Sequence, residues 1–378
     1  MTLQRRFSDT LRIAGHRFDK RFVLVCVLLG LVFLLAACGQ APRPPAGWSG
    51  PVLNDGTLFI GSRDGKMLAV EQQTGKVTWE YPRGTDFVSH VYSTPVISSD
   101  RVYYGGYNGK VYALDVKTGL KQWEFSTGKP IVGDVAVDAD RVYAGSEDGK
   151  LYSLQRQDGI KAWEFTAGDR IWAGPALDGE AVYVGTMSGD FFKLKTATGA
   201  RVWSFKAGGA IAAPPLVTKD AVYVGSFDRT FYALDAQTGQ VKWRHQSDNW
   251  FWTRPVASGA TVYATSMDGR LYAFDAATGQ VRWRFPSAPS ATVKPPGALR
   301  AWPVLTDGLV VFSDVDGRVF AVDARTGDQR WDTALGSPVY APLATDGKAV
   351  YASALNKDIV ALDVKAGNKL VTIKTEVK

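Results

Sequence analysis

Cysteine and histidine are scarce in this chain of 378 residues, which has two cysteines and three histidines. Both cysteines, Cys26 and Cys38, lie close to the N-terminus, so the long remainder of the chain can form no disulfide of its own. Two histidines, His90 and His245, remain beyond the N-terminal region, far apart in the sequence. This composition argues against a zinc site of His and Cys ligands.

Motifs of several enzyme classes are missing as well. No Gly-x-Ser-x-Gly elbow of a serine hydrolase is present. The run Gly61–Lys66 lacks the spacing and the following Ser or Thr of a phosphate-binding loop, and Asp314–Gly317 lacks the downstream Glu of a calcium loop. We interpret both runs as hairpin turns, and we expect neither catalytic residues nor a bound metal.

The positive charge of the chain is concentrated at its start. The formal net charge is +7, but the first 21 residues hold six basic and two acidic side chains. Without residues 1–37 the charge falls to +3, and no basic run or stripe is left. A nucleic-acid partner is therefore not expected.

What the sequence does contain is a repeat with a period of about forty residues. Its clearest copy runs through Val222–Asp228, Phe231–Asp235, Thr238-Gly239 and Val241–Trp243. The tail of the repeat ends in tryptophan seven times, and an eighth copy ends in Val371 instead. The seven tryptophans are Trp79, Trp123, Trp163, Trp203, Trp243, Trp283 and Trp331. One residue type at one repeat position indicates a shared packing role.

Each copy carries four short β-rich runs separated by turn residues, and helical periodicity is absent beyond the N-terminal region. Asp-Gly or Asn-Gly pairs, such as Asp148-Gly149, favour two-residue hairpins between the second and third runs. The sequence therefore predicts an all-β fold, an eight-bladed β-propeller of four-stranded antiparallel blades over residues 50–378. The last copy has all four of its own strands, so we expect the ring to close by packing of blade 8 on blade 1. We expect this seam between blades to be the first to open.

The run Val222–Asp235 followed by Thr238-Gly239 and Trp243 resembles the repeat of pyrroloquinoline-quinone (PQQ)-type propellers. That resemblance implies that each repeated tryptophan docks between neighbouring blades. Quinone-dependent dehydrogenases of this superfamily have longer chains with a vicinal disulfide, calcium ligands and an aspartate base. Because this chain has no such cysteine pair and no large insertion, we expect no PQQ cofactor and no dehydrogenase activity.

The N-terminal region has the pattern of an export signal. Basic residues precede an uncharged apolar run of sixteen residues, Phe22–Ala37, which is short for a membrane span. The ending Leu35–Cys38 resembles the bacterial lipoprotein processing site, which implies a signal peptide over residues 1–37 and lipid on Cys38. An uncleaved signal anchor is the alternative. Residues 38–49 then form the lipidated cysteine and a proline-rich tether that holds the propeller near the membrane.

Two departures from the repeat locate a candidate binding face. The spacing of the Thr-Gly position is 44, 40, 40, 40, 40, 48 and 40 residues, and both insertions, within Pro82–Ser93 and Pro286–Ala301, fall in the same kind of connection between blades. The second insertion contains Pro289, Pro295, Pro296 and Gly297, which predicts a stiff loop.

When the copies are aligned on the proline before the first run, this connection also carries large aromatic and arginine side chains. The predicted partner- or ligand-binding residues are Tyr92, Trp172, Trp250, Trp252, Arg254, Arg300 and Trp302. Aromatic residues with arginine on surface loops are typical of binding hot spots. The alternative is that they roof the central channel. Asp134, which takes the place of the proline in its copy, is expected either to face the channel mouth or to cap a turn.

Together these features predict a monomeric, non-enzymatic propeller, exported and lipid-anchored on the non-cytoplasmic side of a membrane, that binds a protein partner in the cell envelope. An eight-bladed ring behind a lipoprotein signal is similar to the propeller lipoproteins of the β-barrel assembly machinery. That similarity implies a role in outer-membrane protein assembly, at the periplasmic face of an outer membrane where one exists and otherwise at the cell surface. The alternative is a surface lipoprotein that binds a small ligand or glycan.

Overall fold

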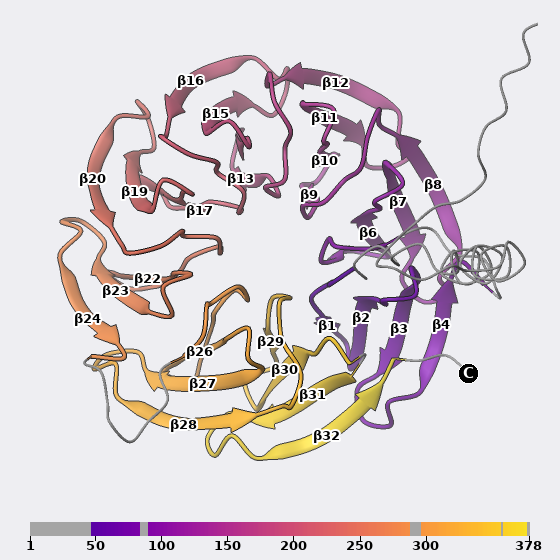
Figure 1. Ribbon diagram of the computed structural model, residues 1–378. Helices are drawn as coiled ribbons and strands as arrows, with labels where there is room; N and C mark the ends of the chain where they lie inside the picture. Colours follow the sequence, from indigo (N-terminus) through magenta and orange to yellow (C-terminus); the bar gives the residue numbers. More distant parts are fainter. Residues whose placement is uncertain (1–46, 84–89, 288–295, 357, 376–378) are drawn as a thin grey trace, which may run out of the picture. The chain divides into compact units, whose positions relative to one another are not determined.

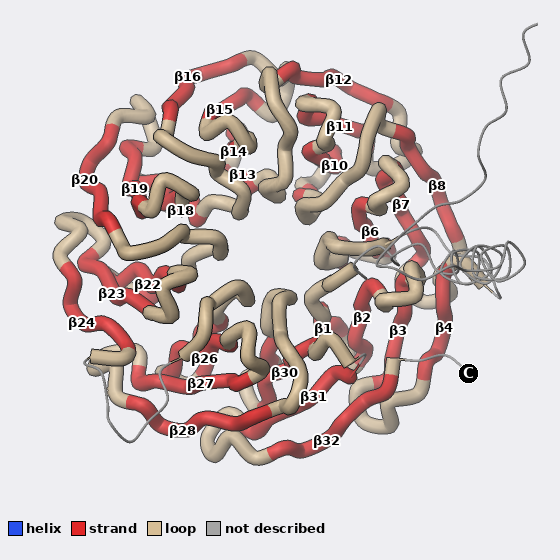
Figure 2. Tube along the Cα trace, viewed as in Figure 1, coloured by secondary structure: helices blue, strands red, loops and turns tan. Residues whose placement is uncertain are grey.

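The computed structural model describes residues 47–83, 90–287, 296–356 and 358–375. The predicted signal peptide, Cys38 and most of the tether lie outside these ranges, as do Pro289 and Pro295. Within the described ranges every regular element is a strand (Figure 2), and no helix has the length and hydropathy of a membrane span.

The described residues form thirty-two strands, which follow one another in chain order. The first sixteen are β1 (Val52–Asn54), β2 (Thr57–Gly61), β3 (Met67–Glu71), β4 (Val77–Tyr81), β5 (Val96–Ser98), β6 (Arg101–Gly105), β7 (Lys110–Asp115), β8 (Lys121–Ser126), β9 (Ala136–Val137), β10 (Arg141–Gly145), β11 (Lys150–Gln155), β12 (Lys161–Thr166), β13 (Ala176–Asp178), β14 (Ala181–Gly185), β15 (Asp190–Lys195) and β16 (Arg201–Lys206). The remainder are β17 (Leu216–Val217), β18 (Ala221–Gly225), β19 (Thr230–Asp235), β20 (Val241–Gln246), β21 (Val256–Ser258), β22 (Thr261–Thr265), β23 (Leu271–Asp275), β24 (Val281–Phe285), β25 (Val304–Thr306), β26 (Leu309–Ser313), β27 (Arg318–Asp323), β28 (Gln329–Ala334), β29 (Ala344–Thr345), β30 (Ala349–Ser353), β31 (Asp358–Asp363) and β32 (Lys369–Lys374).

Each successive set of four strands forms one antiparallel sheet, and the eight sheets are arranged as blades around a ring (Figure 1). The first strand of each blade is innermost and the fourth, such as β20, lies at the circumference. The predicted all-β, eight-bladed fold is therefore confirmed. Blade 8 consists of β29–β32 alone, as the complete last repeat predicts.

The turns within blades explain the repeated polar residues. In blade 5, the Asp235 carboxylate accepts hydrogen bonds from the backbone N–H groups of Gln237 and Thr238 and from the Thr238 hydroxyl. Asp275 makes the same three bonds one blade later. In the run Asp314–Gly317, which only resembles the start of a calcium loop, the Asp314 carboxylate accepts hydrogen bonds from the backbone N–H groups of Asp316 and Arg318. This run is therefore a turn, as expected.

Seven of the eight seams between blades are closed by the repeated tryptophan of the fourth strand. In each seam, the indole Nε1 donates a hydrogen bond to a backbone carbonyl of the next blade. The accepting residue is the one directly after the third strand of that blade. These bonds are Trp79 to Val116 (3.0 Å), Trp123 to Arg156 (3.0 Å), Trp163 to Thr196 (2.8 Å), Trp203 to Ala236 (3.2 Å), Trp243 to Ala276 (3.0 Å), Trp283 to Ala324 (3.2 Å) and Trp331 to Val364 (2.7 Å).

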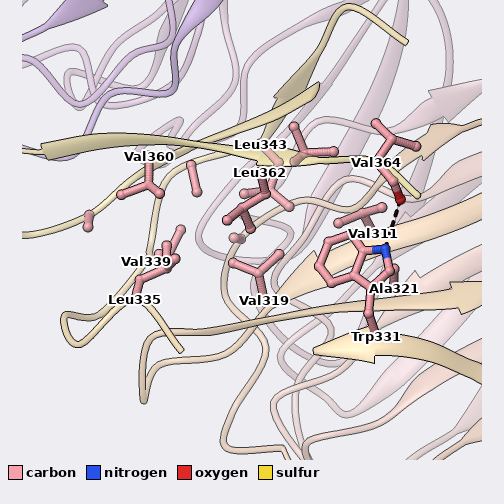
Figure 3. Packing of buried hydrophobic residues seen from close by; sticks show 14 of the residues in the cluster. Val311, Val319, Ala321, Trp331, Leu335, Val339, Leu343, Val360, Leu362 and Val364 are labelled. Carbon is pink, nitrogen blue, oxygen red and sulfur yellow. Dashed lines mark hydrogen bonds between the residues drawn. The ribbon is translucent and has the colours of Figure 1, made fainter. Parts of the chain in front are cut away.

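The seams are also continuous apolar cores. Figure 3 shows Trp331 and Val319 of blade 7 packed against Val360 and Leu362 of blade 8, with the indole bonded to the Val364 carbonyl. Burying an aromatic side chain of this size contributes about 2–3 kcal/mol by area.

The glycine of the Thr-Gly turn is required by the same contact. Gly239 has φ +74°. A Cβ at that position would lie 2.7 Å from Cδ2 of Trp203, which packs on the glycine from the preceding blade. At each of these seven seams, a tryptophan of one blade thus packs on a turn of the next blade at a glycine, which has no side chain to obstruct the indole.

The seam between blades 8 and 1 is built differently. Val371 and Ile373 of β32 pack against Leu58 and Val70 of blade 1, without an indole. Hydrogen bonds from blade 1 side chains reach blade 8: Arg63 donates to the Leu355 carbonyl, and Gln72 donates to Tyr351 and, at 2.7 Å, to Asp346. The ring therefore closes through aliphatic packing and polar side chains.

Candidate functional site

The two faces of the ring carry different loops. Because the strands alternate in direction, the turns between second and third strands lie at the same end of a blade as the connections to the next blade. We call this end the mouth face. Turns between first and second strands and between third and fourth strands, such as the Asp235–Gly239 turn, lie at the opposite face.

On the mouth face, one position per blade lies four residues before the first strand. We call these eight positions the mouth ring: Trp48, Tyr92, Val132, Trp172, Ala212, Trp252, Arg300 and Tyr340. The alignment on proline misplaces two of them. Counting back from Asp134 in blade 3 and Pro342 in blade 8 gives Ile131 and Val339 at this position. The strand register instead pairs Ala136, Ala176 and Ala344 with the equivalent Tyr143, Tyr183 and Tyr351, so Val132 and Tyr340 belong to the ring.

The mouth ring surrounds a cavity of about 340 Å³. Side chains or backbone from all eight blades line it, which places it on the axis of the ring. Of the predicted binding residues, Tyr92, Trp172, Trp252, Arg300 and Trp302 are part of this lining. These five side chains, distant in sequence, share one site.

One half of the mouth is a chain of aromatic contacts. Trp48 meets Tyr92 edge-on, with ring centroids 4.6 Å apart, and meets Tyr340 at 6.0 Å on its other side. The guanidinium of Arg300 lies 4.9 Å from the Trp252 ring and 5.2 Å from the Tyr340 ring. Each such cation–π contact contributes about 0.5–1 kcal/mol where it is exposed.

The aromatic chain continues outward over blade 5. Phe227 stacks on Trp250, with centroids 4.7 Å apart, and on Trp252 at 4.8 Å. Trp250 is 41% exposed and lies outside the cavity lining. An indole that is stacked on one face and open on the other is available to a partner.

In the other half of the mouth the side chains are smaller, and some of them are charged. Val132 and Ala212 take the ring positions beside Trp172. The Trp172 indole donates to the Glu147 carboxylate at 2.8 Å, and Arg170 lies over its ring at 5.9 Å. These side chains leave the central space open.

Asp134 and Arg254 introduce charge into the connections that lead to the mouth. They occupy equivalent positions, two residues before the first strand of blades 3 and 6. Asp134 lines the mouth cavity, and its carboxylate accepts a hydrogen bond from the Thr94 amide at 2.6 Å. It therefore has both of the expected roles, because it faces the mouth and caps the connection of the neighbouring blade. Burial raises the pKa of its carboxyl to about 6, while the Thr94 amide and the positive charge of Arg254 act in the opposite direction.

A second, outer circle of apolar side chains surrounds the mouth. It comes from the turns between second and third strands of six blades, two residues after the end of the second strand, where blades 1 and 3 have Arg63 and Glu147. Its members, all partly or largely exposed, are Tyr107, Met187, Phe227, Met267, Val315 and Leu355. In blade 5 the turn beneath is fixed by Asp228, which accepts the Tyr232 hydroxyl at 2.7 Å. The mouth face is therefore apolar and preorganised.

Comparison with known proteins agrees with this architecture. The family model described as outer membrane protein assembly factor BamB matches residues 39–170, 156–284 and 248–376. The chain belongs to this family. The resemblance inferred from the repeat is thereby confirmed.

Two solved structures show a similar fold. The crystal structure of BamB from Moraxella catarrhalis has a TM-score of 0.68 and 21% identity, over 80% of this chain and 92% of that one. The computationally designed Ika8 protein has a TM-score of 0.70 and 19% identity, over 87% of this chain and 97% of that one. At these identities the likeness concerns the fold. No curated protein matches the sequence.

The BamB-family mouth does not fit a calcium-bound quinone. Asp134 and Glu147 are the carboxylates in the lining of the cavity, and each already accepts a hydrogen bond from its own blade or its neighbour. No group of three or more His, Cys, Asp or Glu suited to a metal occurs among the described residues. We therefore derive no redox step at this site.

Sequence reasoning missed several residues of the mouth. The alignment on proline passes over Tyr340 in blade 8, and the sequence analysis assigns no role to Phe227 or Tyr107. Alignment on the tyrosine of the second strand would place Tyr340 correctly. Arg254 was expected beside Trp252 on a binding surface; it is exposed, but it does not line the cavity.

Proposed function

We propose that this chain is a non-enzymatic protein-binding scaffold of the cell envelope, which takes part in the assembly of outer-membrane proteins by binding a protein partner on its mouth face. Membership of the BamB family supports the cellular process. The observation that carries the choice of face is the half-exposed aromatic chain of the mouth, with Trp250 41% exposed and stacked on Phe227. Aromatic side chains of this kind dominate binding energy at protein interfaces.

The opposite face supports this choice by contrast. Its repeated carboxylates, such as Asp275 and Asp323, are bonded to backbone amides and arginine side chains of their own blade. These bonds lower the pKa of both carboxyl groups to about 2. The hydrogen-bonding capacity of that face is largely used within the ring, and its exposed apolar side chains, such as Leu120 and Ile160, are aliphatic, whereas the mouth exposes aromatic rings.

The proposal includes a lipid anchor on Cys38 and a monomeric propeller, held at the membrane by the proline-rich tether. Replacing Cys38 by Ala should release the protein from the membrane fraction without changing its unfolding transition, because Cys38 precedes the first strand by many residues. Retention in the membrane fraction would instead support the uncleaved signal anchor.

Site-specific photocrosslinking in intact envelopes tests the choice of face. A photoreactive residue at position 250 should crosslink to outer-membrane proteins or to subunits of the machinery that assembles them. The same probe at Gln237, exposed on the opposite face, serves as the control and should give few such products. Equal crosslinking from both positions would refute a mouth-specific scaffold.

A small ligand or glycan is the second candidate, and the cavity itself favours it, because about 340 Å³ is within the range of small-molecule sites. Replacing both Trp252 and Trp302 by Ala separates the two functions. Loss of the crosslinked proteins supports the scaffold, whereas unchanged crosslinks with loss of a bound small molecule support the second candidate.

A further inference from the structure

Arg300 is held in the mouth by aromatic rings rather than by a carboxylate. Its guanidinium lies 4.9 Å from the Trp252 centroid and 5.2 Å from the Tyr340 centroid, so rings occupy its surroundings on two sides. Within the described residues it makes no ion pair and donates no hydrogen bond within 3.5 Å. Arg282 and Arg330, by contrast, each donate to an aspartate of their own blade. The N–H edge of Arg300 is therefore available to a ligand.

Arg254 adds a second positive charge, which is not part of the cavity lining but acts on Asp134, a residue of that lining. Its side chain is exposed, and no carboxylate of the described residues lies within ion-pair distance of it. Its charge acts on Asp134, whose carboxylate accepts the Thr94 amide. The second acid of the lining, Glu147, accepts the Trp172 indole. The two acids of the lining thus already accept hydrogen bonds, whereas Arg300 and the nearby Arg254 form no ion pair within the described residues.

The space between these groups suits a large apolar side chain. Trp48, Tyr92 and Tyr340 form an aromatic wall, and the wall across from it is made of small residues such as Ala212. A basic ligand is disfavoured, because Arg300 already covers the faces of Trp252 and Tyr340 that would attract a cation.

We propose that the mouth cavity binds an acidic-aromatic segment of the protein partner, in which an aromatic side chain enters the cavity and an adjacent Asp or Glu carboxylate is bound by Arg300, with the positive charge of Arg254 adding to the attraction. This inference rests on the proposed function and specifies what the scaffold recognises. Arginine donates paired hydrogen bonds to a carboxylate, and an arginine fixed between rings loses little side-chain entropy on binding. The charge of the cavity supplies the selectivity, and its aromatic wall supplies most of the buried area.

Isothermal titration of the purified mature protein with short peptides tests the inference. The test peptide has Phe flanked by Asp and Glu, with both ends blocked so that only side chains carry carboxylates. One control peptide replaces the acids by Asn and Gln, and another replaces Phe by Ala. A third has neutral side chains and a free C-terminal carboxylate. We expect the test peptide to bind at least about ten-fold more tightly than each control, and its affinity to fall as salt rises.

Variants locate the binding. Arg300→Gln should weaken binding of the test peptide about ten-fold, and Arg300→Lys should weaken it as well, because lysine lacks the planar fork. Arg254→Gln should weaken it by a smaller factor, because only a nearby positive charge is removed. Asp134→Asn should tighten it, since a negative charge near the carboxylate is removed. Arg325→Gln, an exposed arginine on the opposite face, is the matched control and should have no effect. Thermal unfolding of each variant checks that the ring is intact.

The outcomes separate this inference from the proposed function. Equal binding of the acidic and neutral peptides, or unchanged binding in both arginine variants, overturns the inference. Tightest binding of the peptide with the free chain end overturns the assignment to Asp or Glu. If no peptide binds while position 250 still crosslinks to the assembly machinery, the inference fails and the scaffold stands. If crosslinks are absent as well, the scaffold fails too.

Discussion

The tryptophans of the seams and the aromatic residues of the mouth are the same kind of side chain in two different settings. A seam indole such as Trp203 is 8% exposed, bonded to a carbonyl of the next blade and packed on that blade's glycine. A mouth indole such as Trp250 is 41% exposed, and Phe227 covers one of its faces. The seam indoles recur in seven of eight repeats, whereas the mouth aromatics differ from blade to blade.

The difference shows how a repeat protein separates stability from recognition. A seam residue must satisfy a constraint that every blade repeats, because each neighbouring pair of blades needs the same contact. A mouth residue has no such constraint, and its side chain can match an asymmetric partner. Repetition therefore indicates structure, and loss of repetition indicates binding.

The largest expected effect is that of a seam truncation. Trp203→Ala removes the indole, its bond to Ala236 and its packing on Gly239, and should lower the free energy of unfolding by about 3–5 kcal/mol. Urea denaturation followed by circular dichroism measures it. Trp250→Ala is the control and should cost less than about 1 kcal/mol. Similar losses in the two variants would remove the distinction between seam and mouth.

The glycine of the seam gives a sharper form of the same test. Gly239 and Gly308 have nearly equal φ values, +74° and +73°. A Cβ at Gly239 would clash with Trp203, whereas nothing lies within 4 Å of a Cβ at Gly308. Gly308→Ala should cost about 1–2 kcal/mol for the backbone alone, and Gly239→Ala should cost clearly more. Equal costs in urea denaturation would show that the indole contact is unimportant.

Asp134 tests whether a mouth charge is kept at the expense of stability. Burial raises its pKa in the folded state to about 6, above the ordinary value of 3.8, so folding favours the protonated form. Its contribution is favourable below the unfolded pKa and is lost as pH rises through about 6. Asp134→Asn should therefore be more stable than the parent at pH 8 by about 1–2 kcal/mol and equal to it near pH 3.5. Thermal unfolding at both pH values provides the comparison, and a gain that does not depend on pH would contradict it.

The smallest expected difference is between the eighth seam and the others. Blades 8 and 1 meet through Val371 and Ile373 without an indole hydrogen bond, which is worth about 1 kcal/mol. Native-state hydrogen exchange should show β32 opening at lower free energy than β20. Equal protection of the two strands would mean that the side-chain bonds from Arg63 and Gln72 compensate fully.

Most of the fold could be predicted from the sequence, because residues that recur from repeat to repeat mark where the strands begin and end. A turn glycine and a tryptophan mark every outer strand but the last, with Thr before the glycine in six blades, and Asp-Gly or Asn-Gly pairs mark five of the hairpins. The mouth could be predicted only in part. Proline is a poor reference residue for the alignment. Six blades have proline directly before the first strand, but blade 3 has Val135 and blade 8 has Leu343 at that position. Pro342 of blade 8 lies one residue earlier.

The arrangement of side chains in the mouth was beyond sequence reasoning. Arg300 belongs to blade 7, while the rings beside it, Trp252 and Tyr340, belong to blades 6 and 8. Such a contact depends on the radius of the ring and on rotamers across two seams, and no local pattern encodes either. The same holds for Trp250, whose partner Phe227 comes from the preceding blade's hairpin.

The most direct test of the central claim measures stability and partner binding on the same two proteins. The double variant Trp252→Ala, Trp302→Ala should unfold within about 1 kcal/mol of the parent and lose the crosslinks formed from position 250. Trp203→Ala should do the reverse under conditions where it remains folded. If the double variant keeps its crosslinks and is destabilised as strongly as Trp203→Ala, the mouth aromatics are structural and the assignment of the binding face is wrong.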